Sequence, residues 1–592
     1  MIQSNKAALP KNNYPKFFQS LRFFLPYRRR IILLIGLEIL SAAFLLAGPY
    51  FSKFYIDKAF LNKNMAAFLK ITIFGAAVFL VSSVATLTRD IIKKKSSSRI
   101  KINLAGKFIK HLFSLDLSFF QSHSIGENFY RISDIDTISH FIAEDIPALV
   151  ADLFKLTAIF SISLFLDYRL AAAMVILSPF FFLQSFKIRK KLRSLYEELW
   201  KSQIKLSKRL QEGLSRILVI KAFSLERLQR YAYMRFLIEN IRLSLKIFRW
   251  STFKSLATNI FSRLAYGMIA LYGGWLIIKG SLSLGTYTAA MLYIGQIGIL
   301  LEGFASRFEY FMQKTVAVEK FLEIVETTPG IKDSVDAVVI PSLSRDIVFD
   351  SVTFGYSADR PVFRNLNLRI PLGKWVGIAG PSGCGKTTLL NLILRLYEPQ
   401  AGRILIGGYD IRNIKMDSLR EKVAIATQEP LLFDLSIREN IAYGLSFLSD
   451  EGLYQALEVV RAGGFVKTLA QGIHTNIGEN AAILSQGYKQ RIALARAIVR
   501  NPELLLLDEA TSSIDSQSEE GIFRSLRRER AVKSTIVISH RLFSIADADR
   551  IFFLTGTGRV EEGTHRELME KSNEYREFFQ AQLQEQAGSL RV

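Results

Sequence analysis

The sequence predicts a multi-domain protein in which an α-helical six-span transmembrane domain precedes an α/β domain. The first observation is a series of long apolar runs in the amino-terminal half, of the length that a membrane span requires. The second is a change after about residue 347 to short β-rich runs separated by glycines and helical stretches, which is typical of an α/β domain. The third is charge: residues 1–340 contain 46 Lys and Arg against 23 Asp and Glu, a net charge of +23, whereas the remainder has 31 against 30.

Six windows of the amino-terminal half are apolar enough to span a bilayer, which takes about 20 helical residues. They are 31–52, 66–87, 146–166, 169–186, 256–278 and 284–305. Residues 1–30 form a polar tail followed by mixed aromatic and basic residues, which predicts a helix lying in the membrane interface. Because the first apolar run continues into a full span, we expect no cleavable signal.

The segments between the spans differ in length and charge. Those after the first, third and fifth spans are short, whereas 88–145 and 187–255 are long, basic and patterned as helices. The positive-inside rule places these long segments and both termini in the cytoplasm, and it favours a membrane protein over one that binds nucleic acid. Folded as two antiparallel helices, a segment of about 55 residues would project roughly 40 Å from the membrane. This reach predicts contact with another domain below the membrane.

Charged residues inside spans are costly, so each is a candidate for contact with transported cargo. Glu38, Arg263 and Glu302 all fall at the depth of the inner leaflet. One interpretation is that Glu38 and Arg263 pair with each other, or snorkel, and hold helices together. The other is that these residues form a polar wall of an inward-open cavity. The sequence leaves both open.

A phosphate-binding loop follows the predicted buried strand 375–380, and a helical stretch follows the loop. The pattern GxxxxGK[ST] in this setting predicts an α/β P-loop ATPase domain with ATP and Mg²⁺ as cofactors. Glycines let backbone N–H groups surround phosphate, Lys386 reaches the β- and γ-phosphates, and the Thr387 hydroxyl binds Mg²⁺. The expected nucleotide-binding residues of the loop are Gly380, Pro381, Ser382, Gly383, Cys384, Gly385, Lys386, Thr387 and Thr388.

Cys384 is the only cysteine, which excludes an intrachain disulfide and a CxxC-type metal site. It lies near a helix N-terminus and near Lys386, and both favour the thiolate form. We therefore expect maleimide reagents to inactivate the protein and MgATP to protect it. The alternative is that Cys384 only fills space, as serine would.

Two further predicted strands end in residues suited to ATP hydrolysis. Four consecutive leucines lead into Asp508 and Glu509. Asp508 at the strand end suits a role at the Mg²⁺ site, and Glu509 can polarise the attacking water as general base. The strand 534–540 ends in His540, which is placed to contact the γ-phosphate.

The motifs resemble, in order and over nearly the whole chain, those of the ABC (ATP-binding cassette) transporter superfamily. Tyr356 resembles the aromatic residue that stacks on adenine, and Gln428 resembles the glutamine that links Mg²⁺ and water to the membrane domain. LSQGY at 484–488 resembles the family signature LSGGQ, which closes the partner's ATP site. Asp515 resembles the D-loop aspartate, and residues 562–565 resemble the family's closing segment.

The membrane half is similar to that of the six-helix exporter type. Residues 115–138 and 212–227 resemble its two cytoplasmic coupling segments, so the long projections are expected to dock on the ATP domains. The expected domains are the tail and interfacial helix at 1–30, the transmembrane domain at 31–325, a linker at 326–346 and the nucleotide-binding domain at 347–592.

The resemblance implies a dimer in which each ATP lies between Lys386 and Thr387 of one chain and Ser485 and Gly487 of the other. Closure of this sandwich would open the cavity outward, and hydrolysis by Glu509 would reset it, driving export or flipping by alternating access. The expected cargo is amphipathic, namely a lipid, a drug or a peptide, with a mild preference for an anion. The expected setting is the bacterial inner membrane, in contact with lipid and without nucleic acid.

One departure from the family pattern concerns the partner. Gln486 stands where glycine is usual and Tyr488 where glutamine is usual, while Ser485 and Gly487 are intact. In some exporters a damaged signature marks a heterodimer with one degenerate ATP site, so the partner is either a second copy, which we favour, or a homologous half-transporter.

Rival functions fit the sequence less well. Intact Glu509 and His540 argue against an ATP-gated channel or regulatory receptor, and the six apolar runs exclude a soluble ATPase acting on DNA. A peptide exporter with a built-in cysteine protease would need an amino-terminal domain and a nucleophilic cysteine outside the phosphate loop. An importer of this type is less common in the family.

Overall fold

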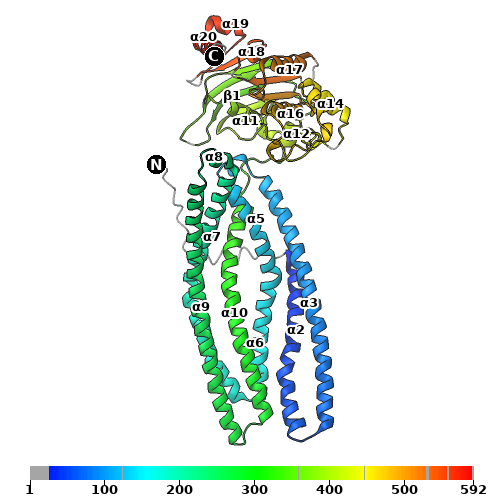
Figure 1. Cartoon of the computed structure of the whole chain (residues 1–592), viewed down its shortest axis with the longest axis vertical. Helices are drawn as coiled ribbons and strands as arrows, with labels where there is room; N and C mark the ends of the chain where they lie inside the picture. Colours follow the sequence, from blue (N-terminus) through cyan, green and yellow to red (C-terminus); the bar gives the residue numbers. More distant parts are fainter. Residues whose placement is uncertain are drawn as a thin grey trace. The chain divides into compact units, whose positions relative to one another are not determined.

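A computed structural model describes residues 26–589, except 123–124, 358, 446, 529–532, 540 and 556–558. The chain divides into two compact units, Met1–Pro329 and Gly330–Val592. The described part of the first unit is helical, and the second contains two sheets with helices around them (Figure 1). This arrangement confirms the predicted combination of a helical domain and an α/β domain.

All six expected spans lie within helices of the first unit. Four stretches of described residues meet the length and apolarity of a membrane span: Arg28–Phe60, Met65–Phe113, Asp134–Leu166 and Glu226–Ile278. The helices of this unit are α2 (Arg28–Phe54), η2 (Tyr55–Phe60), α3 (Met65–Phe113), α4 (Leu117–Ser122), α5 (Ile125–His140), η3 (Phe141–Asp145), α6 (Ile146–Leu166), α7 (Tyr168–Ser215), α8 (Ile217–Ala222), α9 (Glu226–Ile278) and α10 (Leu284–Val325).

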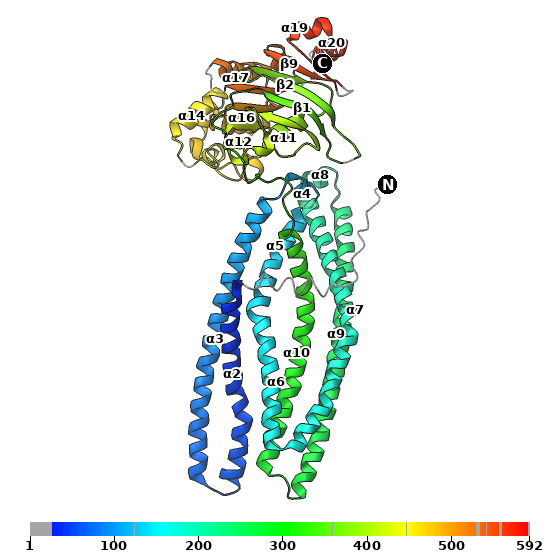
Figure 2. The same cartoon turned by 180° about the vertical axis from the view of Figure 1, so that it is seen from behind.

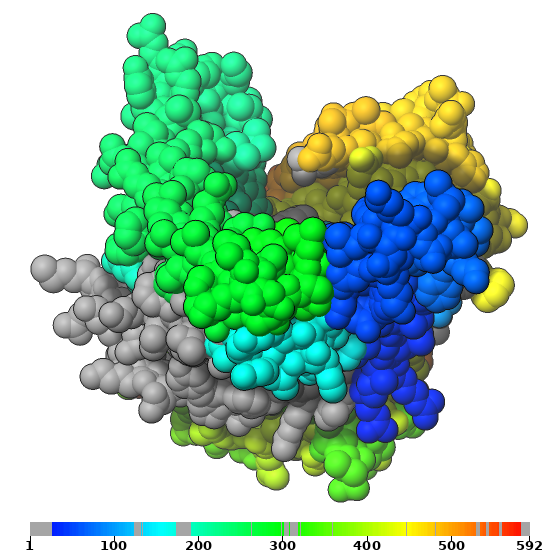
Figure 3. Space-filling view, turned by 90° about the horizontal axis from the view of Figure 1, so that it is seen from below, coloured from blue at the N-terminus to red at the C-terminus, as the bar shows by residue number. Residues whose placement is uncertain are grey.

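Each of the three short connections starts the next helix with a side-chain cap. The side chains of Asn64, Asp167 and Ser283 accept hydrogen bonds from the first backbone N–H groups of α3, α7 and α10. At the same end of the bundle, Asp57 accepts hydrogen bonds from Ser283 Oγ at 2.9 Å and from the backbone N–H of Gly285 at 3.0 Å. The α2–α3 connection therefore lies against the start of α10, as the blue and green surfaces in Figure 3 show.

The long basic segments are helical, as their pattern predicts. Helices α7 and α9 run side by side over most of their length, and the short helix α8 joins them (Figure 2). At the corresponding end of α3, the Phe108 ring stacks on Phe321 of α10 with centroids 5.1 Å apart. His111 Nε2 donates to the carbonyl oxygens of Ile324 and Thr327, both at 3.0 Å. The end of α10 is thus fixed to α3.

The second unit contains an antiparallel sheet of order β2-β1-β4-β5 and a larger sheet of order β10-β9-β3-β8-β7-β6. In the larger sheet all neighbours pair in parallel except β10 and β9. The strands are β1 (Ile347–Phe354), β2 (Phe363–Ile370), β3 (Trp375–Ala379), β4 (Ala401–Ile406), β5 (Tyr409–Asp410), β6 (Val423–Ala426), β7 (Leu504–Asp508), β8 (Ser534–Ile538), β9 (Arg550–Leu554) and β10 (Val560–Gly563).

Helices cover the two sheets and include the segment that carries the signature residues. They are α11 (Lys386–Ile393), η4 (Ile411–Asn413), α12 (Met416–Lys422), α13 (Ile437–Ile441), α14 (Asp450–Val459), α15 (Gly463–Thr468), η5 (Gly472–His474), η6 (Glu479–Ala481), α16 (Gln486–Ile498), α17 (Ser516–Arg528), α18 (Leu542–Ala546), α19 (His565–Lys571) and α20 (Asn573–Ser589). Strands β3, β7 and β8 are entirely buried between them, which explains their continuous apolar sequences.

Residues 330–346, which the sequence places in a linker, form part of the second unit. Ile340 is buried there, and its backbone N–H donates to Ser418 Oγ at 3.0 Å. The backbone N–H of Leu343 donates to the Glu503 carboxylate at 2.8 Å. We call residues 330–346 the strap, because they bind along the surface of this unit before β1 begins.

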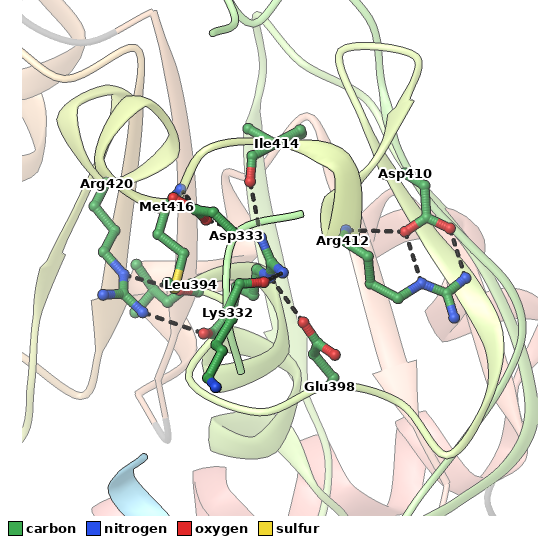
Figure 4. A network of polar contacts seen from close by, with 10 residues as sticks. Lys332, Asp333, Leu394, Glu398, Asp410, Arg412, Ile414, Met416 and Arg420 are labelled. Carbon is green, nitrogen blue, oxygen red and sulfur yellow. Dashed lines mark hydrogen bonds and ion pairs between the residues drawn. The ribbon is translucent and has the colours of Figure 1, made fainter. Parts of the chain in front are cut away.

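Arg395, just after α11, holds the strap from inside the domain. Figure 4 shows its partners Lys332, Asp333, Glu398 and Ile414 gathered close together. The Arg395 side chain is only 2% exposed, and its Nη2 donates to the carbonyl oxygen of Lys332 at 2.9 Å. Nη1 donates to the carbonyl oxygen of Ile414 at 2.8 Å and lies 3.5 Å from Asp333, and Nε donates to Glu398 at 2.9 Å. A buried guanidinium with each nitrogen engaged is a rigid attachment, because its planar donors fix the geometry.

Candidate active site

The phosphate loop connects β3 to α11, as the sequence predicts. Gly380, Gly383 and Gly385 have φ angles of 148°, 81° and 102°, a region that side chains rarely adopt. A Cβ atom at Gly380 would lie 2.4 Å from the Leu554 carbonyl oxygen, and one at Gly385 would lie 2.7 Å from Val362 and Phe363. Glycine is therefore required at both positions to form a loop whose backbone N–H groups can surround phosphate.

Lys386 and Thr387 begin α11 at this loop. Lys386 Nζ donates to the carbonyl oxygens of Gly380 at 2.8 Å and Pro381 at 3.0 Å, so the ammonium group lies across the loop. The Thr387 side chain is exposed beside it. A cation and a hydroxyl at a helix N-terminus form an anion site that suits the phosphates of ATP.

Tyr356 lies beside the same helix. Its hydroxyl and Thr388 Oγ1 are 3.1 Å apart, and its ring meets the Tyr397 ring edge-on with centroids 5.2 Å apart. The Tyr356 side chain remains about half exposed, at 53%. One edge of the ring is thus fixed by neighbours while part of its surface stays available for stacking on a base.

Glu509 directly follows β7, and Asp508 is the last residue of that strand. Asp508 is buried, whereas Glu509 is partly exposed with its backbone N–H donating to Ile538 of β8 at 2.9 Å. Glu509 has a φ of 50°, an uncommon conformation for a side chain of this size that is often associated with functional sites. His540 lies outside the described residues, two positions after β8 ends.

Gln428 follows β6 on the other side of β7, and its side chain is exposed. Because β3, β8, β7 and β6 are parallel, their carboxyl ends meet at one edge of the sheet. The fold therefore brings the phosphate loop, Asp508, Glu509 and Gln428 to one edge. The Thr387 hydroxyl and the Asp508 carboxylate are hard oxygen donors of the kind Mg²⁺ prefers, so these residues fit that ion.

The signature residues begin α16. Ser485 caps this helix, and its Oγ accepts from the backbone N–H of Tyr488 at 3.5 Å. A Cβ at Gly487 would lie 3.0 Å from the Ser513 carbonyl oxygen, so the helix start packs closely on the loop before Asp515. Hydrogen bonds from Ser518, led by that of its backbone N–H, hold the pKa of Asp515 below its usual value.

The structure accounts for the unusual Tyr488. Its ring stacks on Phe465 of α15 with centroids 3.8 Å apart and an interplanar angle of 21°, and the Arg491 guanidinium lies 5.3 Å from the ring centroid. Tyr488 thus packs within its own domain instead of disturbing the capping arrangement of Ser485.

The structure contradicts the expectation that Cys384 favours the thiolate form. Burial raises the pKa of the Cys384 thiol, and the opposing effect of Lys386 is smaller. The sequence pattern predicts the thiolate because it shows only the nearby helix N-terminus and Lys386. It does not show that the folded loop buries the thiol.

We therefore expect maleimide labelling of Cys384 to be slow at neutral pH and to accelerate by about tenfold per pH unit, since only the thiolate reacts. This increase should continue to a pH above the usual range of cysteine, and MgATP should protect the thiol. The measurement is the labelling rate from pH 7 to pH 9.5, with and without MgATP, followed by an ATPase assay. Labelled protein with full ATPase activity would show that Cys384 only fills space.

The sequence leaves two interpretations open for the charged residues in the spans, and the structure contradicts the one that pairs Glu38 with Arg263. Glu38 is buried and binds Arg89 at 3.2 Å and Lys93 at 3.6 Å, both on α3, so the proposed Glu38–Arg263 pair is wrong. Arg263 is exposed on α9. The side chain of Glu302 lies outside the described residues.

The membrane domain contains a second charged cluster that was not predicted from the sequence. Asp152 of α6 is 2% exposed and binds Lys155 at 3.1 Å and Arg307 of α10 at 2.9 Å. The signal was available, because Asp152 and Lys155 lie three residues apart within a predicted span and therefore on one helix face. Among the side chains that the structure describes here, two cations share one carboxylate, and this set carries a net positive charge.

Comparison with known proteins identifies the family. Residues 31–299 match the family model described as ABC transporter transmembrane region, and residues 363–512 match the model described as ABC transporter. Together these matches cover most of the chain.

Two relatives and one solved structure are similar over most of the chain. The chain is 31% identical to an ATP-dependent lipid A-core flippase of Syntrophus aciditrophicus, over 96% of this chain and 95% of that protein. It is 29% identical to the leukotoxin translocation ATP-binding protein LktB of Mannheimia glucosida, over 92% of this chain and 77% of that protein. A bacterial Atm1-family ABC exporter with ATP bound superimposes with a TM-score of 0.86 at 27% identity, over 94% of this chain and 98% of that chain. The chain therefore belongs to the ABC transporter family, as an exporter-type protein that joins a transmembrane domain to an ATP-hydrolysing domain and uses ATP to drive export.

Proposed function

We propose that two copies of this chain form the working exporter, with MgATP held in two sites that the copies share. The supporting observation is the position of Tyr488, which packs on Phe465 and leaves Ser485 and Gly487 at the start of α16. The unusual signature therefore keeps the hydroxyl, the backbone N–H groups and the helix dipole that bind phosphate.

Each chain supplies most of its own ATP site in this proposal. The loop Gly380–Gly385 and Lys386 bind the phosphates, Tyr356 stacks on the base, and Glu509 accepts a proton from the attacking water. Thr387, Gln428 and Asp508 would hold Mg²⁺, which neutralises phosphate charge when bound. His540 would contact the γ-phosphate, and Asp515 would stand near the partner's nucleotide. ATP drives the cycle because it binds the closed state more tightly than the open state.

A homodimer predicts that the purified chain alone forms dimers and hydrolyses ATP. We expect Tyr488→Gln to change the rate by less than about threefold, because the ring does not carry the phosphate contacts. The measurements are molar mass in a lipid nanodisc and steady-state ATPase activity of both proteins. A chain that is inactive alone, and active only with a second subunit carrying LSGGQ, would establish the heterodimer instead.

We further propose that the cargo is an amphipathic anion and that the membrane is a bacterial inner membrane. The cargo proposal is supported by the positive cluster of Asp152, Lys155 and Arg307, whose Arg307 side chain is 38% exposed. The membrane proposal is supported by the bacterial origin of the similar proteins. A phosphate or carboxylate headgroup could bind this surplus charge while its chains stay in lipid.

The cargo proposal predicts that phosphorylated lipids stimulate the ATPase more than cationic drugs or neutral peptides do. Arg307→Gln should raise the half-stimulating lipid concentration about tenfold, as loss of one charge-assisted hydrogen bond would, and leave basal activity unchanged. The control is Arg169→Gln, which removes the cation that pairs with Asp167 at the short connection between α6 and α7. Equal stimulation by cationic and anionic compounds would contradict the proposal.

A further inference from the structure

The side chain of Gln490 connects three parts of the nucleotide-binding unit. Gln490 lies on α16, five residues after Ser485, and is 1% exposed. Its Nε2 donates to the carbonyl oxygen of Gln428 at 3.1 Å and to Ser512 Oγ at 3.0 Å. Its Oε1 accepts from the backbone N–H of Ser513 at 2.9 Å. Both the donor and the acceptor ends of the amide are therefore bonded to loops outside α16.

These loops belong to different ATP sites in the proposed dimer. Gln428 and the segment that starts at Glu509 serve the chain's own nucleotide. Ser485 and Gly487, at the start of α16, serve the partner's nucleotide. Ser512 and Ser513 lie between Glu509, which serves this chain's own nucleotide, and Asp515, which is proposed to stand near the partner's nucleotide. A displacement of the 509–515 loop must either move α16 or break the hydrogen bonds of Gln490.

A separate side chain holds the same loop from the other direction. Arg541 donates to the carbonyl oxygens of Ser512 at 2.8 Å and Ile514 at 2.5 Å, and to the Glu519 carboxylate at 2.7 Å. Glu519 is 3% exposed and also accepts from Thr511 Oγ1 at 2.7 Å. Because Arg541 supports the loop independently, the loop should stay folded when Gln490 is replaced.

We infer that Gln490 is a positioning residue that couples the two ATP sites of the dimer. It joins the helix that presents Ser485 and Gly487 to the partner with the loops that carry this chain's own Gln428 and Glu509. A buried, fully bonded amide suits this role because it leaves little freedom between the elements it joins. The inference rests on the proposed function, since it requires a dimer with shared sites.

The first test replaces Gln490 by methionine, which has a similar length and cannot form these hydrogen bonds. We expect kcat to fall about tenfold, within the range of measured coupling effects, and the Hill coefficient for ATP to fall towards one. The Kd for a fluorescent ATP analogue should stay within about twofold, because Lys386 and Thr387 are untouched. Gln455→Met makes the same change at an exposed position of α14 and should have no effect.

The decisive test uses mixed dimers of the full-length chain in nanodiscs. One subunit is wild type, and the other carries Glu509→Gln with or without Gln490→Met. The hydrolysing site then uses Glu509 of the wild-type subunit and the signature residues of the variant subunit. We expect Gln490→Met in the variant subunit to reduce the remaining ATPase activity about tenfold, because its α16 serves the other subunit's nucleotide.

Equal activity of the two mixed dimers would overturn the inference, since Gln490 would then act only within its own site. A lower melting temperature with unchanged kcat would likewise make it a purely structural residue. If the proposed function were wrong, the wild-type chain would form no active dimer. That result is obtained before any Gln490 variant is tested, so failure of the proposed function is distinguishable from failure of this inference.

Discussion

Glu509→Gln should abolish most ATP turnover while ATP binding persists. A positioned general base contributes about 10²- to 10⁴-fold to a rate, and an amide cannot accept the proton. The substitution preserves the length of the side chain. The backbone hydrogen bond from residue 509 to Ile538 does not depend on the side chain, so the local geometry should survive. The measurements are steady-state ATPase activity in nanodiscs and the Kd of a fluorescent ATP analogue.

Lys386→Ala is the matched comparison for this variant. Lys386 lies across the phosphate loop, so its loss should weaken ATP binding as well as turnover. Comparing the two variants distinguishes a residue needed to bind ATP, Lys386, from a residue needed only to hydrolyse it, Glu509. Near wild-type hydrolysis by the Glu509→Gln protein would show that the base is another residue at the same edge of the sheet.

Arg395→Ala should be the most destabilising change in the strap region. It removes a cation that is 2% exposed and leaves Glu398 and two backbone carbonyl oxygens without this donor. A hydrogen bond to a charged group contributes about 1.5–3 kcal/mol, so losing this set of bonds should cost about 3 kcal/mol or more. For a domain of this size, a loss of about 3 kcal/mol lowers the melting temperature by roughly 6–12 °C. The measurement is calorimetry of the full-length protein, in which the transition that shifts with MgATP reports the nucleotide-binding unit.

Arg403→Ala is the control for this prediction. Arg403 pairs with Asp350 at 2.8 Å, but the side chains are 58% and 41% exposed, and such surface pairs contribute at most about 1 kcal/mol. The melting temperature should therefore change little. Equal destabilisation by the two substitutions would mean that burial of Arg395 is not what holds the strap.

The structural setting of the predicted ATP site could be inferred because its parts are local in sequence. A buried strand, a glycine-rich loop and a helix follow one another at 375–393, and their order dictates a phosphate site. The same holds for Glu509 at the end of β7. The sequence did not show that β8 lies between β3 and β7, although this order brings these residues to one edge.

The features that were missed depend on partners far apart in sequence. Glu38 pairs with Arg89, 51 residues away, and Asp152 pairs with Arg307 on another helix. Arg395 holds Lys332 across 63 residues. Periodicity reports which residues share a helix face, but it does not report which helices meet, so these ion pairs could not be assigned beforehand. The raised pKa of Cys384 has the same origin, because burial arises from tertiary packing.

The strap and the end of α10 together set the length of a tether. Thr327 is held by His111 in the helical unit, and Lys332 is held by Arg395 in the nucleotide-binding unit. Only five residue steps separate these two attachments, and a fully extended chain spans at most about 3.6 Å per step. While both hydrogen bonds last, the two anchor points can therefore never be more than about 18 Å apart. Any movement during the transport cycle must therefore keep these two attachments within that distance.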